Sequence, residues 1–305
     1  MTDNRFIEAA RLGKNDFWRY AATFFLTISL FLMSGVCAVT VLIVQSGAIN
    51  LTGETMEGTL DLSNLPGPGF LLANLVPFIF ILLGLWIGVC LIHRRPFFSL
   101  VNPLGGGFDW WRFGLSAGLW LLLSALGDFV LSLIQPGNYV FNFDLPALLP
   151  VLAIALVFLP LQVAGEELFF RGYLTQGFGH RFGFWAAWII PSIFFGLLHG
   201  ANPEVGAYGM LMTMPLYIGM GLLLGWITLR SESLELALGM HLANNFYAAL
   251  LVTFPSSALT TPALFTIQEY NAGATMVAFF VICAVYLALL YALGRGFFRK
   301  GLFNR

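Results

Sequence analysis

Residues 147–171 read ALLPVLAIALVFLPLQVAGEELFFR, an apolar run that ends in two glutamates and an arginine. A helix needs about 20 mainly apolar residues to cross the hydrocarbon core of a bilayer, and this run is long enough. Carboxylates inside such a helix cost free energy, so in membrane proteins they mark functional sites. The stretch therefore indicates both the environment of the chain and the place of its chemistry.

The composition of the whole chain agrees with a membrane environment. Of its 305 residues 59% are apolar and only 10% are charged, whereas a soluble domain carries roughly 25% charged residues. The net charge of -1 says nothing about nucleic acid, but the sequence has no basic patch with interleaved aromatics, so we expect no nucleic acid and the lipid bilayer as partner. We predict an all-α polytopic membrane protein with about eight transmembrane helices, at 20–45, 69–92, 113–134, 147–171, 184–200, 207–229, 234–254 and 274–294.

The basic residues predict the orientation of these spans. Lys and Arg concentrate on the cytoplasmic side of membrane proteins. Here they precede the first span, follow the last and occupy alternate linkers, whereas linkers 46–68, 135–146, 201–206 and 255–273 contain none. We therefore expect the N- and C-termini to be cytoplasmic.

The chain divides into four predicted regions: a cytoplasmic N-terminal segment (1–19), spans 1–3 (20–134), spans 4–7 as a catalytic core (147–254), and span 8 with a basic cytoplasmic tail (274–305). The polar N-terminal segment is expected to lie on the membrane surface as an amphipathic helix or to be a solvated tail. The glycine pairs Gly114/Gly118 and Gly221/Gly225 are expected to let helices approach closely.

The two glutamates are expected to have different roles. Arg171 follows Glu167 by four residues and lies on the same helix face, so it can pair with Glu167 and keep it ionised. Glu166 points about 100° away and is expected to face a polar cavity. This spacing favours a structural Glu167–Arg171 pair and a chemical role for Glu166.

Two further motifs are expected to meet Glu166. His199 ends span 184–200, and it lies as far from the turn near 181–183 as Glu166 does. In an antiparallel helix pair, the two side chains would then share one depth. His241 and Asn245 lie on one face near the cytoplasmic start of span 234–254. The predicted common site lies between mid-membrane and the cytoplasmic face.

These residue types suit hydrolysis of an amide without a covalent intermediate. A glutamate in a water-poor cavity suits a general base, and a histidine opposite it can share the activated water. A second histidine and an amide can donate to a developing oxyanion. The same His, His and Glu set can instead ligate zinc, with water completing the site, although the sequence contains no HExxH.

Other interpretations stay open at this point. The polar residues can be structural, as a salt bridge and as hydrogen bonds between helices. Asp128 is expected to be a structural hydrogen-bonding group, and His93 and His180 are expected to be surface residues in linkers. A proton- or ion-coupled transporter is a further alternative, although no inverted repeat is visible. The last is a non-catalytic membrane immunity or scaffold protein.

Taken in order, three motifs carry a resemblance to a known family: Glu166-Glu167-x-x-x-Arg171, Phe195-x-x-x-His199 and His241-x-x-x-Asn245. The set resembles the CAAX protease and bacteriocin-processing family, which includes the type II CAAX endopeptidases, and the likeness covers roughly 150–250. It implies a glutamate-dependent intramembrane endopeptidase that requires no metal and acts on a membrane-associated peptide or protein.

The resemblance also implies a role for each residue. Glu166 would activate water with His199 as its partner, His241 and Asn245 would be the oxyanion donors, and Glu167 and Arg171 would support them. Prenylated CAAX proteins are the substrates of eukaryotic members, whereas some bacterial relatives are linked to bacteriocin maturation or self-immunity. The compact loops and short termini favour a protein of the bacterial cytoplasmic (inner) membrane and disfavour a prenylated substrate.

Overall fold

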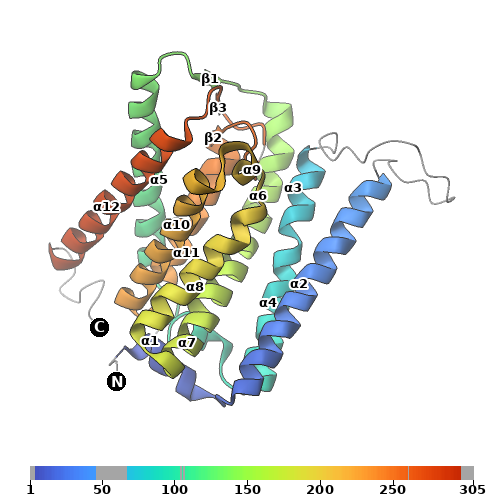
Figure 1. Cartoon of the computed structure of the whole chain (residues 1–305), viewed down its shortest axis with the longest axis vertical. Helices are drawn as coiled ribbons and strands as arrows, with labels where there is room; N and C mark the ends of the chain where they lie inside the picture. Colours follow the sequence, from blue (N-terminus) through green and yellow to red (C-terminus); the bar gives the residue numbers. More distant parts are fainter. Residues whose placement is uncertain (1–3, 46–66, 104, 106, 260, 297–305) are drawn as a thin grey trace.

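The protein is a bundle of long helices that carries a small sheet at one end (Figure 1). The computed structural model describes residues 4–45, 67–103, 105, 107–259 and 261–296. Most of the predicted linker 46–68 and residues 297–305 of the predicted basic tail lie outside these ranges.

The elements run as follows along the chain. The α-helices are α1 (Arg5–Glu8), α2 (Phe17–Gln45), α3 (Gly67–Leu75), α4 (Pro77–Trp86), α5 (Trp110–Ile134), α6 (Leu145–Glu167), α7 (Thr175–Phe182), α8 (Phe184–Leu198), α9 (Pro203–Tyr208), α10 (Met210–Ser231), α11 (Glu235–Phe246) and α12 (Ala272–Gly296). Short 3₁₀-helices are η1 (Ala9–Leu12), η4 (Phe97–Leu100) and η6 (His199–Ala201), and π-helices are η3 (Ile87–Ile92), η5 (Leu168–Leu174) and η7 (Tyr247–Leu251). The strands are β1 (Tyr139–Phe141), β2 (Val252–Thr253) and β3 (Phe265–Ile267).

Long apolar helices make this an integral, multi-pass membrane protein, as the composition predicts. Among the described residues, 7 helical stretches are long and apolar enough to cross a bilayer: Phe17–Val44, Gly67–Ile92, Trp110–Ile134, Leu145–Phe182, Phe184–Ala201, Met210–Ser231 and Ala272–Leu293. They correspond to predicted spans 1–6 and 8. The predicted all-α polytopic fold is confirmed.

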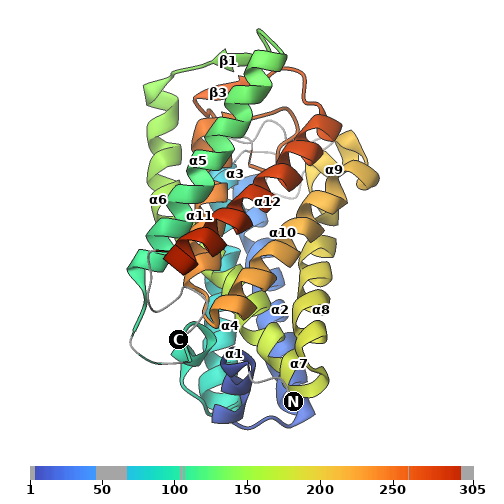
Figure 2. The same ribbon diagram turned by 90° about the vertical axis from the view of Figure 1, so that its left-hand side faces the viewer.

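Predicted span 234–254 differs from the others. It forms α11 and η7, which end where β2 begins. At 1.5 Å per residue, Glu235–Leu251 rises about 26 Å, less than the ~30 Å hydrocarbon core. Leu236 and Met240 are fully buried. Because α11 packs on α5, α6 and α10, and Figure 2 shows α5 and α12 in front of it, this helix lies inside the bundle and is shielded from lipid.

The sheet joins two linkers that lack Lys and Arg, at the end of the molecule opposite α1 (Figure 1). β3 is central: it pairs antiparallel with β1, Tyr139 opposite Ile267, and parallel with β2, Val252 opposite Phe265. Below it, the Asp128 carboxylate on α5 accepts hydrogen bonds from the hydroxyls of Tyr139 (2.8 Å) and Tyr247 (2.7 Å). Asp128 has the hydrogen-bonding role that the sequence indicates.

The N-terminal segment is folded onto the protein. Phe6 and Ile7 of α1 are 0% and 1% exposed, and α1 packs on α7. Asn4 donates to the Leu229 carbonyl (2.7 Å), and Arg5 pairs with Glu232 (2.9 Å). Residues 4–12 therefore pack against the ends of helices of the bundle, which differs from the predicted surface helix or solvated tail. The prediction placed the apolar side chains of α1 against lipid, whereas they pack against α7 of the same protein.

The two glycine pairs have different outcomes. A Cβ on Gly221 of α10 would lie 2.6 Å from the Ser192 carbonyl oxygen on α8, so this glycine is required for the close approach of the two helices. Gly225 faces the same helix. The prediction is wrong for Gly114 and Gly118, since within the described chain a Cβ at either position would meet no atom within 4 Å.

His93 is buried, which corrects its expected surface position. Its exposed fraction is 1%. Nδ1 lies 2.7 Å from the Lys14 carbonyl oxygen and Nε2 lies 3.0 Å from the Tyr173 hydroxyl. A carbonyl only accepts, so Nδ1 donates to Lys14, while the Tyr173 hydroxyl at Nε2 also donates to the Tyr20 carbonyl oxygen (3.4 Å). Burial, with Arg95 adding to it, lowers the pKa of His93 from its ordinary value.

We expect this histidine to make stability depend on pH. Because its folded-state pKa is below the unfolded value, the unfolded chain takes up the proton first, and stability is lost as pH falls below about 6.5. Replacing His93 by Gln should lower the melting temperature in detergent at pH 7.5, and the difference from wild type should shrink at pH 5. His180→Gln, at an exposed position, is the control. An equal difference at both pH values would contradict a lowered pKa for His93.

Candidate active site

The C-terminal end of α6 carries three buried polar side chains. Gln162 and Glu166 are each 7% exposed, and Glu167 is 0% exposed. The helix continues directly into η5, a π-helix whose wider turn leaves the Phe170 carbonyl to accept from the Thr175 hydroxyl (3.1 Å). π-Helical turns are rare and are frequent at functional sites. The backbone thus departs from α-geometry just after the two glutamates.

Glu167 and Arg171 form the pair that their spacing predicts. Arg171 Nη1 donates to Glu167 Oε1 over 2.8 Å, and the two side chains are 1% and 0% exposed. The guanidinium also lies 4.1 Å from the centre of the Phe195 ring and donates to the Gly221 carbonyl oxygen (3.4 Å). Contacts from α8 and α10 therefore hold Arg171 in place, in addition to its ion pair with Glu167 at the end of α6.

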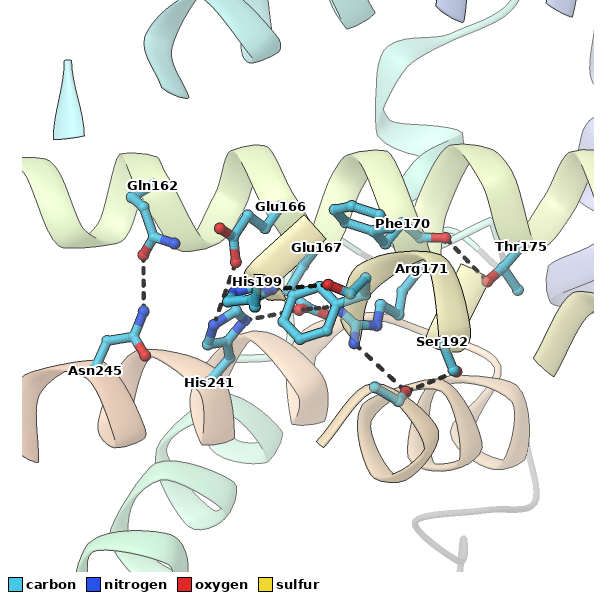
Figure 3. A network of polar contacts seen from close by, with 12 residues as sticks. Gln162, Glu166, Glu167, Phe170, Arg171, Thr175, Ser192, His199, His241 and Asn245 are labelled. Atoms are coloured by element: carbon cyan, nitrogen blue, oxygen red, sulfur yellow. Dashed lines mark hydrogen bonds and ion pairs between the residues drawn. The ribbon is translucent and has the colours of Figure 1, made fainter. Parts of the chain in front are cut away.

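His241 of α11 lies between the two glutamates (Figure 3). Its Nδ1 is 2.8 Å from Glu167 Oε1, and its Nε2 is 3.5 Å from Glu166 Oε2. An ionised carboxylate only accepts, so Nδ1 donates to Glu167, and this bond fixes the ring with Nε2 toward Glu166. The sequence placed His241 near the site, but it gave no indication that one imidazole would contact both carboxylates.

His199 reaches this group through Phe195. Its Nδ1 lies 2.7 Å from the Phe195 carbonyl oxygen and so donates to it, which leaves Nε2 as its second polar atom. The imidazole lies 4.5 Å from the Phe195 ring and 4.5 Å from the Tyr217 ring, nearly parallel to the latter. Phe195 is in turn 6.0 Å from the His241 ring. Among the described residues, no hydrogen bond or ion pair joins His199 to Glu166 directly.

Tyr217 is itself held by polar groups beyond the site. Its hydroxyl accepts from Asn202 Nδ2 (2.8 Å) and donates to the buried Glu204 carboxylate. Nothing in the sequence singled out Tyr217, because a tyrosine in an apolar helix has no distinctive signal. It nevertheless sets the plane of the His199 ring.

Asn245 lies one turn beyond His241 and faces Gln162. Its Nδ2 donates to Gln162 Oε1 over 2.8 Å. Gln162 was not among the predicted site residues, although a polar residue one turn before Glu166 in an apolar run is a recognisable signal. The structure thus brings Glu166, Glu167, Arg171 and His241 into one contact network, and it places Asn245 and His199 beside that network.

The donor set bears on the zinc interpretation. His241 Nδ1 donates to Glu167, so Nε2, which faces Glu166, is the ring atom of His241 that a metal could use. In the part of the chain that the structure describes, no group of three or more His, Cys, Asp or Glu side chains is arranged to hold a metal ion. The geometry that is present is one of hydrogen bonds and ion pairs.

Comparison with known proteins matches the part of the chain that forms this site. Residues 146–247 match the family described as type II CAAX prenyl endopeptidase, Rce1-like. The chain is also 31% identical over 267 residues to the protein of Bacillus subtilis (strain 168) named "Uncharacterized protein YyaK", which covers 85% of this chain and 86% of that relative. No solved structure matches the chain significantly. The chain belongs to the Rce1-like family of type II CAAX prenyl endopeptidases.

Proposed function

We propose that the protein is an intramembrane glutamic endopeptidase that uses Glu166 to activate water against a peptide bond of a membrane-associated peptide or protein. One observation carries this proposal: His241 lies between Glu166 and Glu167, with Arg171 behind Glu167, inside a bundle whose other long helices are apolar enough to span a membrane. A buried charge network of this kind costs free energy, and a role in chemistry explains why it is placed there.

The proposed roles follow from the contacts. Glu166 Oε2 is buried and faces His241 Nε2 at 3.5 Å, so the other carboxylate oxygen, Oε1, is the one proposed to act on water. It takes a proton from water while the water oxygen attacks the carbonyl carbon, and the carbonyl electron pair moves onto oxygen. Glu166 then returns the proton to the amide nitrogen as the C–N bond breaks.

Donors for the oxyanion come from α11. His241 is proposed as one of them, because its Nε2 lies 3.5 Å from Glu166 Oε2 while its Nδ1 is held by Glu167. Asn245 has a second amide hydrogen besides the one it gives to Gln162. His199 Nε2 is the atom left to orient the attacking water. Preorganised donors of this kind act most strongly in a water-poor site.

The chemistry is proposed to need no metal, because among the described residues no three His, Cys, Asp or Glu side chains are arranged as ligands. The proposed location is a bacterial cytoplasmic membrane, on the support of the asymmetric basic linkers and the bacterial relative. The proposed substrates are membrane-bound precursors such as bacteriocin or immunity peptides, alongside CAAX-type peptides, the substrate class named by the family.

The central prediction concerns Glu166→Gln, which keeps the side-chain shape but removes the base. The purified variant is reconstituted in liposomes and is given two kinds of substrate: internally quenched peptides, with and without S-farnesyl cysteine, and isolated bacterial membranes. Its rate of peptide-bond cleavage should be about 100- to 10,000-fold below that of wild type, because general base catalysis contributes that much. His199→Ala should lose activity as well. Glu269→Gln, an exposed carboxylate, is the matched control, and a zinc chelator should leave wild-type activity unchanged.

Each arm of that experiment is decisive. Cleavage is scored as fluorescence and as new peptide termini by mass spectrometry. Full activity in Glu166→Gln would remove the assignment. If wild type and Glu166→Gln give the same termini in all preparations, the protein is not a peptidase, and a non-catalytic immunity or scaffold role takes its place.

The hydrogen bond of His199 predicts which ring nitrogen acts. Nδ1 is already used by the Phe195 carbonyl, so Nε2 does the chemistry. A glutamine amide reaches the position of Nε2, whereas an asparagine amide reaches only that of Nδ1. His199→Gln should therefore retain about tenfold more kcat than His199→Asn, since one positioned hydrogen-bonding group is worth about this much or more. The reverse order would show that Nδ1 acts.

Arg171 predicts a loss of stability rather than of chemistry alone. Arg171→Met leaves Glu167 buried without its guanidinium, which costs about 3–5 kcal/mol when one partner of a buried pair is removed. Thermal unfolding in detergent should show a large decrease in melting temperature. Arg181→Met, on the exposed side of α7, should change it little. Equal melting temperatures for the two variants would mean that the buried pair contributes no stability.

A further inference from the structure

Four side chains near the site form a continuous series of hydrogen bonds. Trp120 Nε1 donates to Asn244 Oδ1 (3.2 Å), and Asn244 Nδ2 donates to Asn245 Oδ1 (3.2 Å). Asn245 Nδ2 then donates to Gln162 Oε1 (2.8 Å). This amide chain crosses from α5 through α11 to α6. Trp120 lies outside residues 146–247, the region that matches the family.

The first donor fixes the direction of the whole amide chain. An amide can be turned over so that its oxygen and nitrogen exchange places, and its own shape does not decide which way it lies. An indole N–H can only donate. Trp120 therefore requires the oxygen of Asn244, which turns the Asn244 nitrogen toward the Asn245 oxygen, which turns the Asn245 nitrogen toward Gln162.

Trp120 is held firmly enough to impose this order. Its side chain is 2% exposed, and its ring packs edge-on against Tyr286 of α12 at 5.4 Å and against Phe279 at 6.5 Å. Tyr286 is fully buried and is tied by its hydroxyl to Ser116 on α5 (2.6 Å). The indole has no room to turn away from Asn244.

The last amide ends beside the proposed base. Gln162 lies one turn before Glu166 on α6, and Figure 3 shows its oxygen toward Asn245 and its nitrogen on the side of Glu166. No described residue accepts a hydrogen bond from Gln162 Nε2. The chain of donors thus delivers amide N–H groups, and no amide oxygen, to the place where a carbonyl oxygen would gain negative charge.

We propose that Trp120 and Gln162 are positioning residues, which hold the Asn245 amide with its nitrogen directed at the substrate carbonyl. This inference rests on the proposed peptidase function, because it assigns a purpose to Asn245 in that reaction. A flipped Asn245 would present an oxygen lone pair to the developing oxyanion, which would repel it. The amide chain prevents that orientation.

The hydrogen bonds are tested first without catalysis. The protein contains 8 tryptophans, so ¹⁵N-indole labelling in detergent gives few NMR signals, and Trp120→Phe identifies the signal of Trp120. Asn244→Leu should shift this indole N–H signal and speed its exchange with solvent. Gln162→Met should shift it less, through the two intervening amides. Gln176→Met, which removes another buried glutamine bonded to the Ser99 carbonyl, should leave it unchanged.

The activity arm uses the same liposome assay and peptides. Trp120→Phe and Gln162→Met should each lower kcat about tenfold, a part of the 100- to 1,000-fold that one oxyanion donor contributes. KM should change less than twofold. The pH dependence of kcat/KM should not move, because the amide chain contains no titratable group. Trp188→Phe removes a comparable indole bond, to the Leu222 carbonyl (2.8 Å), and should leave kcat unchanged.

The outcomes separate this inference from the proposed function. If Glu166→Gln abolishes cleavage while Trp120→Phe and Gln162→Met keep wild-type kcat, the peptidase stands and the positioning role is overturned. A decrease in kcat as large in Trp188→Phe would reduce the effect to packing and overturn it too. A shifted pH profile would show that these residues act on Glu166 instead. An indole signal unaffected by Asn244→Leu would exclude the first hydrogen bond.

Discussion

The structure depends on neutralising two adjacent carboxylates inside a bundle of membrane-spanning helices. Glu167 is fully buried, and an uncompensated charge there would be prohibitive. It is compensated twice on the same oxygen, by Arg171 Nη1 and by His241 Nδ1, each at 2.8 Å. This shared oxygen ties α6 and η5 to α11, and Phe195 packs against Arg171 from α8. The position of Glu166 follows from that fixed neighbour.

Helix α11, which lies inside the bundle, supplies the His241 side chain that contacts both glutamates. It is shorter than a spanning helix, and its neighbours cover it, so His241 and the two asparagines face protein groups and not lipid. Its N-terminal end is buried as well, where Glu235 accepts from Asn102 Nδ2 over 3.0 Å. A helix with so many polar side chains is stable in a bilayer only as the centre of a bundle.

Two kinds of contact hold the residues of the site in place. Charged contacts fix the glutamates and His241, and they are strong because the environment is poor in water. Neutral hydrogen bonds fix Asn245 through Trp120 and Gln162, and ring stacking fixes His199 between Phe195 and Tyr217. The neutral contacts involve residues of α5, α6 and α10 that the three motifs do not contain. The region that supports the chemistry is therefore larger than the motifs that mark it.

The sequence alone determined the fold class, nearly all spans and the three polar motifs, because these depend on local composition and helical spacing. The Glu167–Arg171 pair is a further example, since residues four apart share a face whatever surrounds them. Only the tertiary structure decided that α11 lies inside, that α1 packs on protein, and that Gly114 and Gly118 make no close helix contact. It alone showed His241 between both glutamates and Trp120 at the head of the amide chain. Such contacts join residues more than 70 positions apart, and no local pattern encodes which distant helix a side chain will meet.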